Sequence, residues 1–158
     1  AALVSAIDNL PATPGSRRTV VISGAGDRRD EDIRQQTEIL GDAFDTVVLY
    51  QDQCQRGRAD GEVLALLHQG LTNAARTKQI KEIHGEFLAI DTALEALKPG
   101  DLCLILIDQV EEALAHIQRR VDEAANAQPK PAPRAAAKTV RKPRRSKIAT
   151  TVALGLRL

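Results

Sequence analysis

A glycine-containing turn with ionisable side chains follows the first β-branched run of the chain. Residues 20–32 read V-V-I-S-G-A-G-D-R-R-D-E-D, so a strand-like run stops at a Gly-Ala-Gly turn and opens into a charged helix start. Backbone N–H groups and the positive end of a helix dipole converge at such a junction, which favours an anionic ligand. The sequence therefore predicts a nucleotide- or phosphate-binding edge formed by Gly24, Gly26, Asp27 and Arg28.

The same turn has two other interpretations. It satisfies only the first half of a dinucleotide-binding fingerprint, because Arg29 stands where a third glycine would be, so its support for NAD is weak. Alternatively, the glycines serve a turn that needs a positive φ angle. No G-x-x-x-x-G-K-[ST] string occurs in the chain, which disfavours an ATPase site within it.

Charged side chains also follow the second apolar run, in a loop before a predicted helix whose N-cap is Asp60. Asp52, Arg56 and Arg58 offer one carboxylate and two guanidinium groups in this loop. Arg34, one turn into the helix that follows the first strand, can present its planar fork to a carboxylate or phosphate. Together these groups suit a zwitterionic ligand such as a free amino acid, although each alone fits a solvent-facing role.

The third group of charges follows the most apolar run, residues 102–107. Asp108 and Glu111 can pair with the guanidinium group of a substrate, because carboxylates accept bidentate hydrogen bonds from it. The alternative for these acids, and the one we prefer for Glu112, is a favourable interaction with the start of a helix.

Alternating strand-like and helix-like runs must position these groups. The runs at 19–23, 46–50, 77–83 and 102–108 are predicted to be buried parallel strands, and those at 2–10, 30–40, 61–74, 85–97 and 110–125 to be helices. This order predicts an α/β fold with a Rossmann-like, mostly parallel sheet flanked by helices. The third strand contains Lys78 and Lys81, which predicts a place at the sheet edge. Ligands of such folds bind at the carboxyl ends of the strands.

Composition divides the 158 residues into two parts. Residues 1–126 form the predicted domain and carry all 21 acidic groups, whereas residues 127–158 carry nine of the 22 basic groups and are rich in Pro and Ala. The second part is predicted to be a disordered basic tail. An acidic body with one Tyr, two Phe and no Trp argues against nucleic-acid readout. Because the chain has no Met and begins within a helical pattern, we expect a fragment of a longer protein.

Cysteine and histidine usage bounds the chemistry further. Cys54 and Cys103 lack C-x-x-C spacing, and three scattered histidines form no ligand pattern, so the sequence predicts no metal site and a reduced, cytoplasmic setting. The longest apolar run is too short to span a membrane, and no signal-peptide pattern is present.

Four strings of the sequence carry a family resemblance. They are S-G-A-G-D-R-R-D-E-D-I, L-G-D-A-F-D-T-V-V-L-Y-Q-D, R-G-R-A-D-G-E-V and P-G-D-L-C-L-I-L-I-D-Q-V-E-E-A-L. In them the chain resembles the carboxy-terminal domain of Mur-type amide ligases, and more closely that of the cyanophycin synthetase family. The resemblance covers roughly residues 1–120 and leaves out the basic tail.

The resemblance implies a multidomain ligase that depends on ATP and Mg²⁺ and attaches L-arginine to the β-carboxylates of a poly-aspartate backbone. It implies that this domain is a lid which helps hold the incoming amino acid, and that the intact enzyme is a homo-oligomer. Arg34, Asp52, Arg56 and Glu111 then match substrate-binding positions, with Arg56 shifted slightly and Asp108 a further candidate. ATP and Mg²⁺ would bind mainly to other domains, so this chain alone is expected to be inactive.

Two alternatives stay open at this point. A generic Rossmann-like binding domain would explain the charged loops without any ligase role, and a ligase could use preformed β-Asp-Arg dipeptide in place of free arginine.

Overall fold

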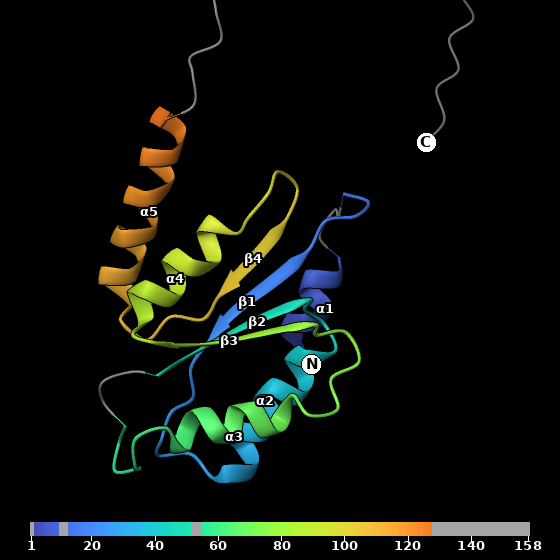
Figure 1. The fold of residues 1–158 in the computed structure, drawn as a ribbon, viewed down its shortest axis with the longest axis vertical. Coiled ribbons are helices and arrows are strands. Elements are labelled where there is room, and N and C mark those ends of the chain that lie inside the picture. The colour runs from blue at the N-terminus through green and yellow to red at the C-terminus, as the bar shows by residue number, and fades with distance from the viewer. Residues whose placement is uncertain (1, 10–12, 52–54, 128–158) are drawn as a thin grey trace, which may run out of the picture. The chain divides into compact units, whose positions relative to one another are not determined.

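The computed structural model describes residues 2–9, 13–51 and 55–127, and Figure 1 shows their arrangement. Its elements, in chain order, are α1 (Ala2–Asp8), β1 (Arg18–Ile22), α2 (Asp30–Gly41), β2 (Thr46–Gln51), α3 (Glu62–Gly70), β3 (Gln79–His84), α4 (Glu86–Glu95), β4 (Leu102–Ile105) and α5 (Val110–Ala127). The predicted basic tail lies outside the described residues. None of the helices within these ranges is long and apolar enough to cross a bilayer.

The four strands form one parallel sheet in the order β3-β2-β1-β4. Val20 of β1 stands opposite Val47 of β2 on one side and opposite Leu104 of β4 on the other. Parallel neighbours need crossover connections, and the intervening helices supply them. The predicted α/β class is therefore confirmed, and so is the edge position of β3.

Alternating side chains give the sheet two apolar faces. Val20 and Val47 point to the face covered by α2 and α3, where Ile33 and Leu67 are fully buried. The next residue of each strand points the other way, so Val21 and Val48 pack against Ala89 and Ala93 of α4 on the opposite face (Figure 1). This period of two is typical of strands covered on both sides.

Helices α2 and α3 cross at a glycine. A Cβ on Gly70 would overlap the carbonyl oxygen of Arg34 and the hydroxyl of Thr37. Thr37 is fully buried and donates to the carbonyl oxygen of Leu67 at 2.7 Å. The helix backbones can approach this closely only because residue 70 has no side chain.

The sequence placed some boundaries and burial wrongly. The helix predicted to reach residue 74 ends at Gly70, and the next residues form turns in which Leu71 N–H donates to His68 and Thr72 N–H donates to Gln69. β3 and β4 are also less buried than predicted, because both lie at sheet edges and each has a neighbour on one side only. Cys103 lies half-buried in β4, where burial raises the pKa of its thiol to about 11.

Asp45 ties the start of the sheet together. Its Oδ2 accepts from the backbone N–H of Arg18 at 2.8 Å, and both of its oxygens accept from the Arg76 guanidinium at 3.0 Å. The hydrogen bond from Arg76 is the main cause that lowers the pKa of Asp45 below its ordinary value of 3.8. Folding therefore favours the charged form of this carboxyl.

We expect Asp45→Asn to lower the free energy of unfolding at pH 7 by about 1 kcal/mol, because an amide has one acceptor oxygen and would direct its NH₂ group at a donor of Arg76 or Arg18. The figure is modest since a quarter of the Asp45 side chain is exposed. The contribution of a carboxyl with a lowered pKa is complete above pH 3.8 and disappears as the pH falls through the folded-state pKa. The difference between the two proteins should therefore shrink towards pH 2.

Urea unfolding followed by circular dichroism at pH 7 and pH 2 measures this difference. Glu38→Gln, at an exposed position of α2, is the charge control and should change stability by less than about 0.5 kcal/mol. An equal Asp45→Asn difference at both pH values would contradict the assignment.

Candidate functional site

The loops that follow strands β1, β2 and β4 meet at one edge of the sheet. Arg56 lies between two carboxylates, with its Nη1 3.5 Å from Asp27 Oδ2 and its Nη2 3.6 Å from Asp108 Oδ1. Asp27 follows β1, Arg56 follows β2 and Asp108 follows β4. The structure thus brings together three residues that the sequence predicted separately, and we call them the Asp27–Arg56–Asp108 cluster.

The cluster borders a cavity of about 190 Å³ at this edge of the sheet. Its lining includes Ser23, Gly24, Ala25, Arg28, Gln36, Tyr50, Arg56, Leu106, Ile107 and Asp108. Two arginines and one aspartate are thus among the lining residues, beside the polar side chains of Ser23, Gln36 and Tyr50. Such a combination can bind a ligand that carries both a carboxylate and a cation.

Arg56 has a strained backbone. Its φ angle of 48° is the single positive value at a non-glycine residue in the described part of the chain. A left-handed conformation at a residue with a side chain costs roughly 1–2 kcal/mol. Because this strain falls on the central residue of the cluster, it fits a site that fixes a side chain for binding rather than one selected only for stability.

Arg58 joins the loop after β1 to the loop after β2. Its guanidinium donates to the carbonyl oxygens of Gly26 and Arg28, both at 2.7 Å, and pairs with Asp30 at 2.8 Å and Glu62 at 2.6 Å. The hydrogen bond with Asp30 is the main cause that raises the pKa of Arg58. The sequence offered Arg58 as a ligand group, but the structure uses it to hold the two loops together.

The two glycines of the first turn are needed for space. A Cβ on Gly26 would overlap the carbonyl oxygen of Gln55, and a Cβ on Gly24 would lie 2.8 Å from Cγ1 of Val63. Neither glycine has a positive φ angle. The interpretation that the turn needs a positive φ is therefore wrong, and close packing of the two loops takes its place.

Carboxylates already occupy the first turn of α2. Asp30 pairs with Arg58, and Asp32 accepts two hydrogen bonds from Arg29 at 2.9 and 2.8 Å. These acids satisfy the positive end of the helix dipole from within the chain. The phosphate-binding edge predicted at Gly24, Gly26, Asp27 and Arg28 stays a prediction.

Three further residues were predicted for the site, namely Arg34, Asp52 and Glu111. Arg34 donates to Gln69 of α3 in a long hydrogen bond of 3.4 Å and is absent from the described lining of the cavity. Glu111 is exposed in the first turn of α5, and Asp52 lies outside the described residues. These three assignments therefore stay predictions.

The N-cap predicted at Asp60 is wrong. α3 begins after Gly61, whose φ of 77° and lack of a side chain set the entry of the helix. The Asp60 carboxylate instead accepts from the side-chain amide of Gln51, and the carbonyl oxygen of that amide accepts from Gly61 N–H at 2.8 Å. A buried glutamine at the end of β2 thus replaces the expected cap.

Sequence reasoning missed Glu86, the first residue of α4. Glu86 is buried, with 3% exposure, and its carboxyl group contacts the Tyr50 hydroxyl and the backbone N–H of Asp108. The available signal was an acidic residue between Gly85 and an apolar helical run. That signal marks a helix start but does not reveal which loop the carboxylate contacts.

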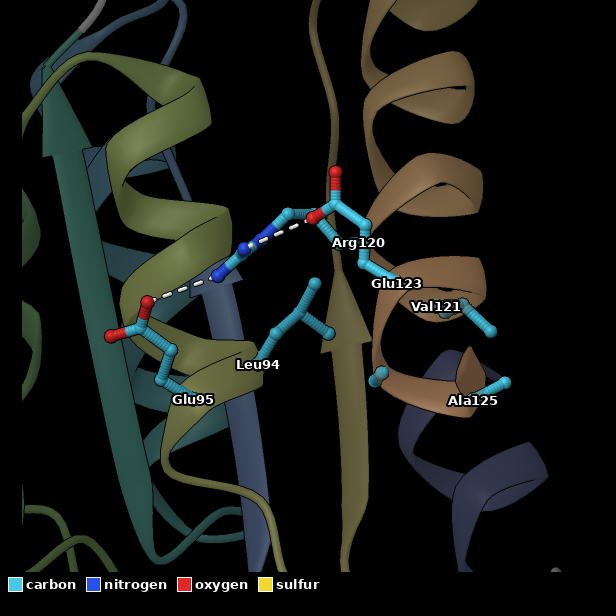
Figure 2. A pocket seen from close by; sticks show the side chains of 7 residues that line it. Leu94, Glu95, Arg120, Val121, Glu123 and Ala125 are labelled. Atoms are coloured by element: carbon cyan, nitrogen blue, oxygen red, sulfur yellow. Dashed lines mark hydrogen bonds and ion pairs between the residues drawn. The ribbon is translucent and has the colours of Figure 1, made fainter. Parts of the chain in front are cut away.

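A larger cavity, about 700 Å³, lies between α4 and α5 (Figure 2). Leu94, Val121 and Ala125 are among its lining residues, and its charged groups are paired with one another. Arg120 contacts Glu95 of α4 at 3.0 Å and Glu123 of its own helix at 3.4 Å. Because no polar group is left over to orient a ligand, we place the candidate site at the smaller cavity.

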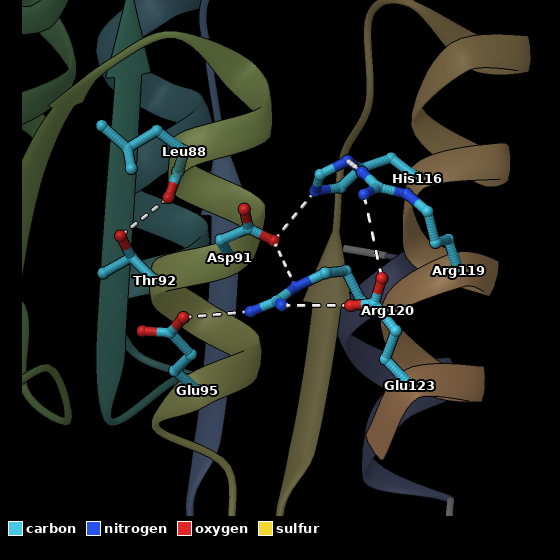
Figure 3. Close-up of polar contacts among 8 residues, drawn as sticks. All are labelled: Leu88, Asp91, Thr92, Glu95, His116, Arg119, Arg120 and Glu123. Atoms are coloured by element: carbon cyan, nitrogen blue, oxygen red, sulfur yellow. Dashed lines mark hydrogen bonds and ion pairs between the residues drawn. The ribbon is translucent and has the colours of Figure 1, made fainter. Parts of the chain in front are cut away.

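The contacts above this cavity hold α5 on α4 (Figure 3). Asp91 Oδ1 lies 2.8 Å from His116 Nε2 and 2.8 Å from Arg120 Nε, and Arg119 contacts the other ring nitrogen of His116 at 2.9 Å. The histidine ring also packs on Phe87. These partners satisfy His116, and no set of three or more metal-binding side chains occurs in the part of the chain that the structure describes.

Comparison with known proteins gives relatives for part of the chain. No family model matches. A cyanophycin synthetase of Crocosphaera subtropica is 34% identical over 104 residues, and one of Trichormus variabilis is 32% identical over 104 residues. Each match covers 66% of this chain and 12% of the relative. The chain thus corresponds to about an eighth of the length of these enzymes.

A solved structure supports the fold. A UDP-N-acetylmuramoyl-L-alanyl-D-glutamate–2,6-diaminopimelate ligase matches with a TM-score of 0.59 at 21% identity, over 76% of this chain and 27% of that chain. At this identity the likeness concerns the fold. Sequence and fold together confirm that this chain is similar to cyanophycin synthetases and has a Mur-ligase-type α/β fold.

Proposed function

We propose that this chain is the amino-acid-holding domain of an ATP-dependent amide ligase, and that it positions L-arginine for attachment to the β-carboxylates of poly-aspartate. The observation that carries the proposal is the Asp27–Arg56–Asp108 cluster beside the 190 Å³ cavity. Similarity to cyanophycin synthetases supports the ligase class. The arginine assignment goes further and rests on the charges of the cavity.

The cavity matches the two ends of arginine. Asp108 can accept two hydrogen bonds from the substrate guanidinium in place of its 3.6 Å contact with Arg56. Arg56 and Arg28 are then available for the substrate α-carboxylate. Binding both ends fixes the α-amine, which is the nucleophile of an amide ligase, so the contribution of the chain is orientation.

In this proposal ATP and Mg²⁺ bind mainly to other domains of the longer ligase. Acids paired with Arg58 and Arg29 occupy the start of α2, the place where a phosphate would bind. No group of metal ligands is present in the described ranges. We therefore assign the nucleotide and its metal to other parts of the longer ligase, and we expect no turnover by this chain alone.

Arg34, Asp52 and Glu111 complete the proposed substrate contacts in the intact ligase. The 3.4 Å hydrogen bond between Arg34 and Gln69 is at the long limit for such bonds and costs little to exchange for a ligand carboxylate. Glu111 is exposed near Asp108 in sequence and offers a second acceptor for a guanidinium.

We expect the 158-residue chain to bind L-arginine in preference to L-citrulline, which lacks the positive charge. Asp108→Asn should weaken arginine binding about 10- to 100-fold, because a charge-assisted hydrogen bond contributes about 1.5–3 kcal/mol. Glu112→Gln, at an exposed position in the first turn of α5, is the matched control and should change affinity less than about twofold. Isothermal titration calorimetry measures all three proteins.

The same titration separates the alternatives. Binding of NAD or a flavin without arginine binding would favour a generic Rossmann-like domain. Binding of β-Asp-Arg dipeptide without free arginine would favour a dipeptide-using ligase. An Asp108→Asn variant with unchanged arginine affinity would remove the cavity from the proposal.

A further inference from the structure

Glu86 is the one charged residue among the fully buried residues of the described chain. Its Oε1 accepts from the backbone N–H of Asp108 at 2.7 Å and from the Tyr50 hydroxyl at 3.3 Å. Its Oε2 accepts from the backbone N–H of Gln109 at 3.2 Å. In the described part of the chain no Lys, Arg or His pairs with this side chain, and its described partners are these hydrogen-bond donors.

Two helix starts converge on this carboxylate. Glu86 is the first residue of α4, and Gln109 immediately precedes α5, whose first turn is closed by a hydrogen bond from Ala113 N–H to the Gln109 carbonyl oxygen at 2.8 Å. The positive ends of both helix dipoles therefore face the anion.

The three donors require an acceptor with two oxygens. A glutamine of the same size has one oxygen and one NH₂ group, so it would direct a donor at one of the donors that Glu86 accepts from. A side chain with two acceptor oxygens therefore satisfies both backbone N–H groups, that of Asp108 and that of Gln109.

The contacts of Glu86 place the loop that carries Asp108. Leu106, two residues earlier, is held as well, because its N–H donates to the carbonyl oxygen of Val21 at 2.9 Å. The single proton of the Tyr50 hydroxyl is shared between the Leu106 carbonyl oxygen at 3.2 Å and Glu86 Oε1 at 3.3 Å. With the backbone held on both sides, the Asp108 carboxylate projects to Arg56 and the cavity. We propose that Glu86 is a positioning residue, which fixes Asp108 for recognition of a guanidinium group in the substrate.

The inference rests on the proposed function for its ligand and on the structure alone for its geometry. It assigns Glu86 no contact with substrate. Its effect passes through Asp108, so the two residues must be coupled and must affect the same property.

The first test needs no ligand. Nuclear magnetic resonance of the 158-residue chain records the Nε–H signal of Arg56, which reports the neighbouring Asp108 carboxylate. Glu86→Gln should move this signal in the same direction as Asp108→Asn does. Glu112→Gln, the exposed control in the first turn of α5, should leave it unchanged. An Arg56 signal unchanged in Glu86→Gln would overturn the proposal, even if arginine binding fails.

The second test uses L-arginine and L-citrulline in a double-mutant cycle. Glu86→Gln should lose at least tenfold of the preference for arginine, and adding Asp108→Asn should cause little further loss. If Glu86 served stability alone, Glu86→Gln would weaken the binding of both ligands equally, or its effect would add to that of Asp108→Asn. Either result would refute the positioning role. Absence of arginine binding in the unmutated protein would instead refute the proposed function.

Amide hydrogen exchange in the unmutated chain covers the case in which Glu86→Gln does not fold. The N–H groups of Asp108 and Gln109 should be protected together, because one carboxylate accepts from both. Exchange of these two amides at the rate of an open loop would contradict the positioning role.

Discussion

Gly26→Ala should lower the free energy of unfolding by about 3 kcal/mol. The added methyl group would overlap the backbone oxygen of Gln55, which cannot rotate away as a side chain can. Overpacking of this kind typically costs 1–3 kcal/mol, and contact with backbone places the cost at the upper end. The loop after β2 must then move, so arginine binding through Arg56 should be lost as well. Urea unfolding and calorimetry measure the two effects.

Gly15→Ala is the matched control. Gly15 has a φ of 82° with no atom within 4 Å of the position of an added Cβ, and it lies outside the candidate site. This change should cost only the left-handed strain of about 1–2 kcal/mol and leave arginine binding intact. Equal stability losses in the two variants would show that the loops after β1 and β2 are not tightly packed.

Gly70→Ala should destabilise the domain by about 3 kcal/mol, contrary to its helix propensity. In an open helix the same change stabilises by about 0.5–1 kcal/mol. Here the methyl group would overlap the carbonyl oxygen of Arg34 and the hydroxyl of Thr37, so α2 and α3 must separate. The steric cost exceeds the gain in helix propensity, so the change in the free energy of unfolding is destabilising. Chemical unfolding followed by circular dichroism measures the difference.

Gln69→Ala provides the comparison at the neighbouring residue. Gln69 is exposed and its described side-chain contact is the long hydrogen bond with Arg34, so the variant should stay within about 0.5 kcal/mol of the parent. A stabilised Gly70→Ala protein would mean that the two helices do not cross closely at this point.

The order of the elements could be predicted because β1 and β2 are short, largely β-branched or aliphatic runs that are buried on two faces, and β4 is a short aliphatic run. Because helical runs alternate with the strands, the strands were predicted to form a parallel sheet. The end of α3 could not be predicted in this way. Leu71 and Ala74 continue the apolar pattern, but the chain turns after Gly70 and on to β3, whose start is held by hydrogen bonds to the carbonyl oxygen of Asp45.

The candidate site was predictable where the topology alone sets proximity. Asp27, Arg56 and Asp108 follow three parallel strands and therefore meet at one edge. Glu86 and Arg58 were not predictable as supporting residues, because their main partners are backbone atoms 22 and 32 positions away. The sequence shows which residues are acidic or basic. It does not show which backbone groups they contact, because those contacts depend on how the loops pack.

Tyr50 gives this protein an optical property of its own. It is the only tyrosine of a chain without tryptophan, and its ring is buried between the sheet and α4 while also lining the 190 Å³ cavity. Tyrosine emission from this protein therefore originates at a single ring in contact with Glu86 and Leu106. Ultraviolet fluorescence can follow the site in the unlabelled protein, from ligand addition to loss of the fold.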